Sequence, residues 1–390
     1  MLLMIVLGVI LLWFILSGCG SDSPPDYSYR PPESMDDGID VGSLEEVGID
    51  FNPLGKVVDR IRDGKYGEVH SMLIYKDGKL VFEEYFPGHQ FKWDGPNYHG
   101  IWVNWNENKE HNIMSAGKSI TSAAVGIAIE EGFIEGVDHS IFDYLPEHQH
   151  LRSAEKEAIT IEHMLTMTSG LAWKEWGASN TGLESDMFKL WVACEDQVAC
   201  VLEKSLDKEP GTDFTYTGGG MTVLGEIVKN ATGMDIEAFA NEYLFAPLGI
   251  DPVRWRRFDS EVIYAGGEQS MTPREMLKFG VTYLNDGLWD GQRIINEDWV
   301  ELSSVPFGDN TGISVPGSDG GRKDYGYSWW IWPTRHNGEE LDAIYAGGWG
   351  GQRIIVIPDL EMVVVLTGGN YTSNTKTFTI TEDFILPAIE

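Results

Sequence analysis

One short segment, Ser115-Ala116-Gly117-Lys118, has the residue types and spacing to form a covalent bond to a substrate. A serine hydroxyl is a weak nucleophile until a neighbouring base takes its proton, and a lysine whose pKa is depressed by burial can act as that base. Residues three apart share one face of a helix, so Lys118 is expected beside Ser115. The chemistry indicated is acyl transfer through a serine ester.

The same Ser-x-x-Lys spacing occurs four times, so the surroundings must identify the relevant copy. Only Ser115 precedes a long run, residues 119–134, that is apolar nearly all round and predicts a helix buried in the middle of a domain. A serine N-cap with an incidental lysine is the alternative interpretation. It is preferred for the copies in charged or polar segments, which are Ser153/Lys156, Ser205/Lys208 and Ser373/Lys376.

Other chemistries are not supported by the sequence. Gly117-Lys118-Ser119 resembles the end of a phosphate-binding loop, but such a loop needs a glycine where this chain has Asn112. With 61 acidic and 28 basic residues, the net charge of −33 would repel nucleic acid. The nine histidines are scattered, and neither His-Glu-x-x-His nor Gly-x-Ser-x-Gly occurs. The sequence therefore predicts no metal, no cofactor and no nucleic-acid partner.

The N-terminal segment predicts export and attachment to a membrane. An apolar run from Leu2 to Leu16 is short for a membrane span and leads into Leu16-Ser17-Gly18-Cys19, which resembles a bacterial lipobox. Residues 1–18 would then be a lipoprotein signal peptide and Cys19 the lipidated residue, facing the periplasm or the cell exterior. An uncleaved anchor is the alternative, since no Lys or Arg precedes the run. Residues 19–45, rich in Pro, Ser and Asp, predict a flexible linker before a domain at 46–390.

Two further cysteines, Cys194 and Cys200, could form a disulfide in an exported protein. On one continuous helix, six residues rise ~9 Å, which is beyond the reach of a disulfide. A bridge therefore requires the chain to turn between them, and the sequence leaves this pairing open.

Strand patterns at both ends of the chain enclose a mainly helical middle. Residues 70–86 contain two apolar runs around Lys76-Asp77-Gly78, a hairpin signal, and the last third of the chain again reads as strands. Residues 115–300 are mainly helical patterns broken by Gly and Pro. We therefore predict an α/β (α+β) fold: an antiparallel sheet built from both chain ends, flanked by helices, with a mainly helical insertion.

From about residue 68 to its end, the chain resembles the serine β-lactamase/DD-peptidase superfamily. The closer likeness is to the branch that holds class C β-lactamases, family VIII-type esterases and nylon-oligomer hydrolases, and it implies a β-lactamase/transpeptidase-like fold. The segments that carry it, in order, are residues 114–147, 159–171, 210–228, 266–289 and 345–368.

The resemblance gives roles to three side chains. Ser115 matches the acylated nucleophile, Lys118 its base partner, and Tyr216 a proton relay whose pKa the nearby ammonium is expected to lower. Tyr216 stands in Tyr-Thr-Gly, where the family has Tyr-x-Asn. The literal Tyr-x-Asn at Tyr283-Leu284-Asn285 lies in a helical pattern, and we interpret it as a decoy.

The third family motif, Lys-Thr-Gly or His-x-Gly, corresponds to Ala346-Gly347-Gly348, which lacks the cation. The two glycines leave room for a substrate, and the backbone N–H groups of Ser115 and Trp349 would form an oxyanion hole. Loss of the cation and of the motif's Asn favours small esters or amides over β-lactams. With Trp349, Trp329 and Trp330 nearby in sequence, apolar acyl groups are expected.

The combined prediction is a membrane-tethered serine hydrolase of small esters or amides that works through an acyl-enzyme. The alternatives are a non-catalytic relative that binds cell-wall fragments, and a weak β-lactamase or DD-peptidase. Intact Ser115, Lys118 and Tyr216 favour the enzyme. The sequence does not specify the oligomeric state or the individual substrate.

Overall fold

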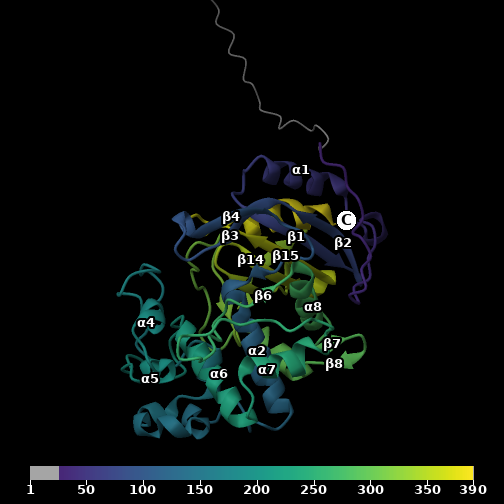
Figure 1. Cartoon of the computed structure of the whole chain (residues 1–390). Helices are drawn as coiled ribbons and strands as arrows, with labels where there is room; N and C mark the ends of the chain where they lie inside the picture. The colour runs from purple at the N-terminus through teal and green to yellow at the C-terminus, as the bar shows by residue number, and fades with distance from the viewer. Residues whose placement is uncertain (1–25, 390) are drawn as a thin grey trace, which may run out of the picture.

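The computed structural model describes residues 26–389, and the predicted signal peptide and Cys19 lie outside them. A seven-stranded antiparallel sheet forms the centre of the molecule, in the order β2-β1-β15-β14-β13-β10-β9 (Figure 1). Both chain ends supply it, as the sequence predicts. Its strands are β1 (Val69–Lys76), β2 (Lys79–Tyr85), β9 (Asp324–Tyr325), β10 (Trp330–Ile331), β13 (Ile344–Gly348), β14 (Gln352–Ile357) and β15 (Met362–Gly368).

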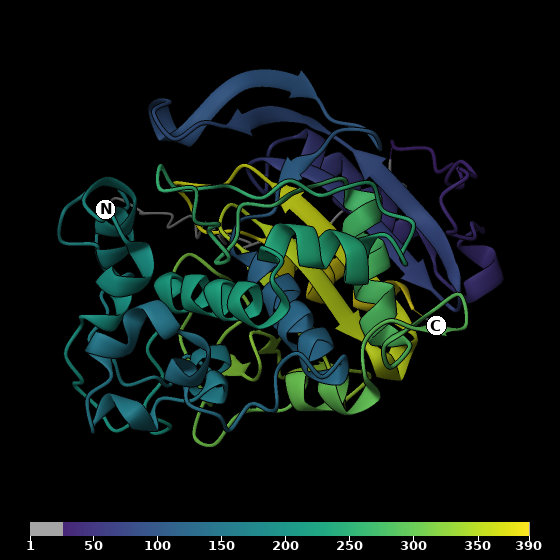
Figure 2. The same cartoon turned by 60° about the horizontal axis from the view of Figure 1, so that its bottom comes forward.

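Eight further strands pair two by two outside this sheet. The pair that matters most for the site is the hairpin of β3 and β4, which Figure 2 shows along the outer edge of the molecule. These strands are β3 (Pro87–Phe91), β4 (His99–Asn104), β5 (His111–Asn112), β6 (Ser270–Met271), β7 (Leu288–Trp289), β8 (Gln292–Arg293), β11 (Thr334–His336) and β12 (Glu339–Leu341).

Helices cover both faces of the sheet. Helix α1 lies over one face, whereas α8 packs on β14 and β15 from the other, where α2, α6 and α7 also lie (Figure 1). The α-helices are α1 (Phe51–Arg62), α2 (Gly117–Glu130), α3 (Ile161–Leu165), α4 (Asp186–Val192), α5 (Gln197–Leu202), α6 (Gly218–Thr232), α7 (Ile236–Ala240), α8 (Pro273–Leu284), α9 (Glu297–Ser303) and α10 (Thr377–Ile380). Among the described residues, none of the helices combines the length and apolarity that crossing a bilayer requires.

Helix α2 is the buried helix that the apolar run after Ser115 predicts. Every residue from Gly117 to Ala128 is buried. The helix ends near Gly132, whose φ of 75° turns the chain away. Because α2 contacts α6, α7 and β13, the residues at its N-terminal end are held by the core on several sides.

The described part of the predicted linker, residues 26–45, contacts the domain through several buried residues. Tyr27 is buried and its hydroxyl donates to Glu84. The ring of Tyr29 stacks on Phe82, with 6.2 Å between ring centroids. Two aromatic side chains among the prolines and aspartates supply enough apolar surface to hold this segment down.

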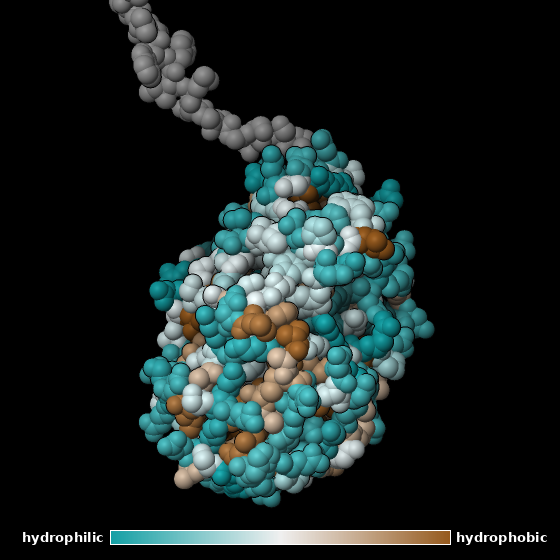
Figure 3. Space-filling model, turned by 60° about the vertical axis from the view of Figure 1, so that its left-hand side comes forward, coloured by the Kyte–Doolittle hydropathy of each residue, from teal (hydrophilic) through white to brown (hydrophobic). Residues whose placement is uncertain are grey.

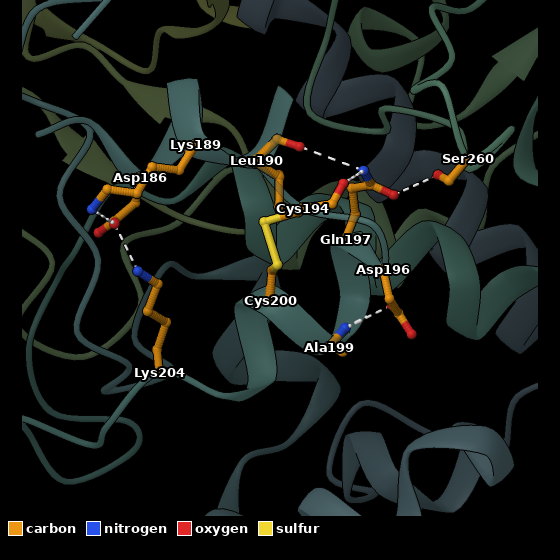
Figure 4. Close-up of a disulfide and its surroundings, with 10 residues drawn as sticks. All are labelled: Asp186, Lys189, Leu190, Cys194, Asp196, Gln197, Ala199, Cys200, Lys204 and Ser260. Carbon is orange, nitrogen blue, oxygen red and sulfur yellow. Dashed lines mark hydrogen bonds and ion pairs between the residues drawn. A yellow bond between two sulfur atoms is a disulfide. The ribbon is translucent and has the colours of Figure 1, made fainter. Parts of the chain in front are cut away.

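The disulfide that the sequence left open is present between Cys194 and Cys200 (Figure 4). Helix α4 ends at Val192 and α5 begins at Gln197, so the chain makes the required turn, and the two Cα atoms lie 6.2 Å apart. The bridge ties α4 to α5. Both helices belong to the side of the molecule on which Figure 3 shows brown apolar patches.

Candidate active site

Ser115 lies in the 3-10 helix η3 (Met114–Ala116), directly before α2. Its neighbour Met114 has a φ of 52°, which a residue with a side chain rarely adopts. The side chain of Asn112 accepts from the Met114 N–H at 2.9 Å, and the Met114 carbonyl accepts from the Glu268 N–H at 3.2 Å. Such a conformation costs ~1–3 kcal/mol and persists only where the surrounding structure imposes it. Strained residues of this kind are common at active sites.

Lys118 is buried beside Ser115. Its Nζ donates to the Ser115 Oγ at 3.0 Å and to the Gly266 carbonyl at 2.6 Å. Burial lowers the pKa of Lys118 to about 8, against the opposing effect of Glu175 and Glu268. The side chain therefore becomes neutral close to physiological pH, which is what the base that accepts the Ser115 proton requires.

Tyr216 completes the group, two residues before α6 begins at Gly218. The Lys118 Nζ lies 4.9 Å from the centre of the Tyr216 ring. We expected the ammonium to lower the pKa of Tyr216, but burial and the charge of Glu175 raise it, and a hydrogen bond with Ser115 offsets this only in part. Tyr216 is therefore a neutral phenol that can donate a proton, and Lys118 is the better base.

Tyr283, the decoy of the sequence analysis, lies elsewhere. It is buried on α8 and packs against Trp329, with 4.3 Å between ring centroids. It is not among the residues that line the cavity in front of Ser115, whereas Tyr216 is. Trp329, for which we expected a place near the pocket, is fully buried beside Tyr283.

The end of β13 approaches the nucleophile closely. A Cβ on Gly348 would lie 2.2 Å from the Ile113 carbonyl, so only glycine lets the strand pack against the segment before Ser115. Gly347, Gly348 and Trp349 line the cavity. Ala346 is buried and is not among the lining residues, so the prediction that it binds substrate gains no support here. The predicted oxyanion residues, Ser115 and Trp349, meet at the same cavity.

The cavity has a volume of about 700 Å³, and aromatic residues form part of its walls. Trp176 stacks on Tyr216 with ring centroids 4.7 Å apart and lies 6.2 Å from Trp330, both at small interplanar angles. Trp93 closes another side, where its indole N–H donates to Glu268 at 3.3 Å. Trp93 comes from the β3–β4 hairpin and Trp176 from the loop before α4, and neither segment contains one of the three motifs.

A cation that the sequence analysis missed also lines the cavity. Arg353 on β14 pairs in register with Gly347 and is 4% exposed. Its Nη1 donates to the carbonyls of Gly348 at 2.8 Å and Gln352 at 2.7 Å. Its Nε has no hydrogen-bond partner among the described residues. Arg353 thus brings a positive charge to the cavity from the neighbouring strand, and only the strand pairing could have revealed it.

The chain is similar to known proteins in sequence. A family model described as Beta-lactamase matches residues 67–379. The chain is 26% identical over 311 residues to penicillin-binding protein 4* of Bacillus subtilis (strain 168), covering 73% of this chain and 64% of the relative. It is 24% identical over 276 residues to the 6-aminohexanoate-dimer hydrolase of Paenarthrobacter ureafaciens, covering 65% of each. The chain thus spans just under two thirds of both relatives.

A solved structure shares the fold. The putative 6-aminohexanoate-dimer hydrolase from Bacillus anthracis superposes with a TM-score of 0.67 at 21% identity, over 93% of this chain and 88% of that one.

Proposed function

Because this chain belongs to the beta-lactamase family, we propose that it is a serine hydrolase that cleaves a small ester or amide through an acyl-enzyme on Ser115. One observation carries the proposal: the Lys118 Nζ lies 3.0 Å from the Ser115 Oγ, in surroundings that lower the lysine pKa to about 8. A serine with a purely structural role has no need of a buried lysine with a lowered pKa beside it. The non-catalytic alternative does not account for this pair.

In the proposed acylation, neutral Lys118 takes the Ser115 proton as the Oγ attacks the substrate carbonyl carbon. The oxyanion accepts from the backbone N–H groups of Ser115 and Trp349, and such donors typically contribute ~3–4 kcal/mol each. Tyr216 gives its proton to the leaving alcohol or amine and recovers one from the Lys118 ammonium. Its raised pKa suits a relay that passes the proton on without accumulating as phenolate.

Deacylation reuses the same groups. Lys118, neutral again, takes a proton from a water molecule, which attacks the acyl carbonyl. The tetrahedral intermediate collapses, the bond to the Ser115 Oγ breaks, and the serine recovers its proton from Lys118. All groups return to their starting state, so the cycle needs no cofactor.

The cavity supports the substrate class. Stacked rings of Trp176, Tyr216 and Trp330 favour apolar acyl or leaving groups. Arg353 would pair with a carboxylate or a polarised carbonyl on the substrate. Short amides with an acidic end fit both features, and one of the relatives is a 6-aminohexanoate-dimer hydrolase.

A second candidate, slow cleavage of β-lactams or cell-wall peptides, is favoured by the same arginine. The charge of Arg353 lies on β14 and not at the motif position on β13, so a β-lactam carboxylate would meet it from a different direction. We therefore expect this activity to be the weaker one.

The test is labelling with a fluorophosphonate probe, followed by kinetics on a p-nitrophenyl ester and on nitrocefin. We expect Ser115→Ala to abolish labelling, and kcat/KM to be far higher for the ester. Labelling that maps to Ser153, Ser205 or Ser373 would contradict the choice of nucleophile. Comparable kcat/KM values for the ester and for nitrocefin would establish the second candidate instead.

We further propose that residues 1–18 are a signal peptide and that a lipid on Cys19 anchors the enzyme in a bacterial membrane, facing the periplasm or the cell exterior. The support is the apolar run and the Leu16–Cys19 segment, together with a disulfide that suits an oxidising compartment. Cys19→Ser should move the protein from the membrane to the soluble fraction. Persistent membrane association would mean that the N-terminal segment is an uncleaved anchor.

A further inference from the structure

A carboxylate and two histidines meet where the β3–β4 hairpin joins the central sheet. Glu68 directly precedes β1, His89 lies on β3 and His99 on β4. The Glu68 Oε1 is 2.6 Å from the Nδ1 of His89 and 3.8 Å from the Nδ1 of His99. One potential ligand atom from each side chain lies within 4.8 Å of the other two. The three side chains are 20–31% exposed, so solvent reaches them.

The hydrogen bonds of His99 determine its tautomer. Its Nε2 lies 2.9 Å from the Gly369 carbonyl, which can only accept, so this nitrogen carries the proton. In neutral His99, the bare lone pair of Nδ1 then faces the Glu68 carboxylate. Two acceptors that face each other need a second proton on the ring, a bridging water molecule or a metal ion between them.

Stacking of the two rings disfavours a proton charge on both of them at once. The rings of His89 and His99 are parallel within 6°, with centroids 4.4 Å apart. Protonating both would place two positive rings face to face, which costs electrostatic energy at that distance. One divalent ion bound by both Nδ1 atoms would balance the carboxylate and leave both rings uncharged, once the His89 proton moves to Nε2 and the rings turn toward the ion.

The carboxylate is prepared for this role. Both of its oxygens are held in place by neighbouring residues. Its Oε2 accepts from the His89 backbone N–H at 2.8 Å and lies 3.2 Å from the His70 Nε2. His70 in turn contacts the buried His111 at 2.8 Å. Such outer contacts, like that of His99 with Gly369, orient metal ligands.

We propose that Glu68, His89 and His99 form a binding site for one divalent transition metal ion, with zinc the best match. Two imidazole nitrogens and one carboxylate, with a position left for water, are a ligand set that zinc prefers. Bonds of ~2.0–2.1 Å require the two parallel rings to turn toward each other, and their partial exposure leaves them room to do so. These residues are far apart in sequence and only the hairpin brings them together, so the sequence predicted no metal site.

The site would also connect metal binding to the active site. The hairpin between His89 and His99 carries Trp93 and Tyr98, whose rings lie 6.1 Å and 4.7 Å from that of Trp349. Trp349 and Trp93 both line the catalytic cavity. A metal ion that joins β3, β4 and Glu68 would therefore hold one wall of the cavity in place.

Metal binding is measured on the purified full chain after treatment with a chelator, by isothermal titration with Zn²⁺ and by the absorption of bound Co²⁺. We expect one equivalent per chain, with the visible bands of a nitrogen–oxygen site. His99→Ala and His89→Ala should each remove this equivalent, whereas His336→Ala, on the β11–β12 hairpin, should keep it. Circular dichroism establishes that each variant is folded.

Two results would overturn the proposal. A folded parent protein that takes up no Zn²⁺ or Co²⁺ at micromolar concentration would show that protons alone balance Glu68. Undiminished binding by both histidine variants would place the metal elsewhere. Neither outcome depends on hydrolase activity, so the metal site and the proposed reaction can fail separately.

Discussion

Removing the charge of Glu175 tests which group takes the proton of Ser115. The Glu175 Oε2 accepts from the Gly218 N–H at 2.7 Å and from the Trp173 indole N–H at 2.9 Å. The amide oxygen of glutamine can accept both bonds in the same place, so Glu175→Gln removes the charge and keeps the contacts. Because the negative charge of Glu175 raises the pKa of Lys118, its loss must lower that pKa.

The size of the effect follows from the lysine pKa of about 8. Neutral Lys118 makes up roughly a tenth of the enzyme at pH 7 and nine tenths at pH 9, so kcat/KM should rise about tenfold and then level off. A lysine with the ordinary pKa of 10.5 would give about a hundredfold rise over the same interval with no plateau. In Glu175→Gln, the rise should begin at lower pH, and activity at pH 7 should increase.

The assay is kcat/KM for a short p-nitrophenyl ester from pH 6 to 10, corrected with Ser115→Ala for spontaneous hydrolysis. A profile that still climbs at pH 9 without a plateau would assign the proton to a group of higher pKa, such as Tyr216. A midpoint that stays in place or moves to higher pH in Glu175→Gln would refute the electrostatic argument.

Three further predictions follow from the site. Tyr216→Phe should lower kcat ~10²–10⁴-fold on the same ester. In a Lys118→Ala background the same change should lower kcat little further, because rate losses within one relay are not additive. The control variant Tyr283→Phe should have the kcat of the parent. Gly348→Ala should lower kcat in a protein whose circular dichroism is unchanged, since its methyl group would press on the Ile113 carbonyl and move β13 away from Ser115. Replacing Cys194 and Cys200 by serine should lower the free energy of unfolding by about 2 kcal/mol, because the unfolded chain regains the entropy of a short closed loop. The loss should be measurable as faster hydrogen exchange in α4 and α5 and as a higher KM.

The parts of the site that could be predicted from the sequence depend on short-range spacing. Ser115 and Lys118 meet because they are three residues apart on one helical turn. The apolar run that follows them identified this copy among the four Ser-x-x-Lys segments. The sheet could also be predicted, since alternating apolar residues occur at both chain ends. Tyr216 required the family resemblance, because nothing in its own segment distinguishes it from a buried structural tyrosine.

The remaining features depend on contacts across strands and loops, which spacing does not encode. Arg353 reaches the cavity from β14 because the β13–β14 turn pairs it with Gly347. The pKa of Tyr216 is raised and not lowered, mainly because the side chain is buried. Rings from distant segments, such as Trp176, contribute to that burial. The aromatic residues that hold residues 26–45 against the domain were obscured by a composition typical of linkers.

The same burial that makes Lys118 a base also lowers the free energy of unfolding, and the packing of α2 offsets this cost. A pKa lowered from 10.5 to about 8 corresponds to roughly 3 kcal/mol. The unfolded chain binds the proton more tightly, so this penalty is fully present below pH 8 and disappears as the pH rises toward 10.5. The strained Met114 adds to it. A helix buried over its whole first three turns, as α2 is, supplies the apolar contacts that let both costs be tolerated at one point in the chain.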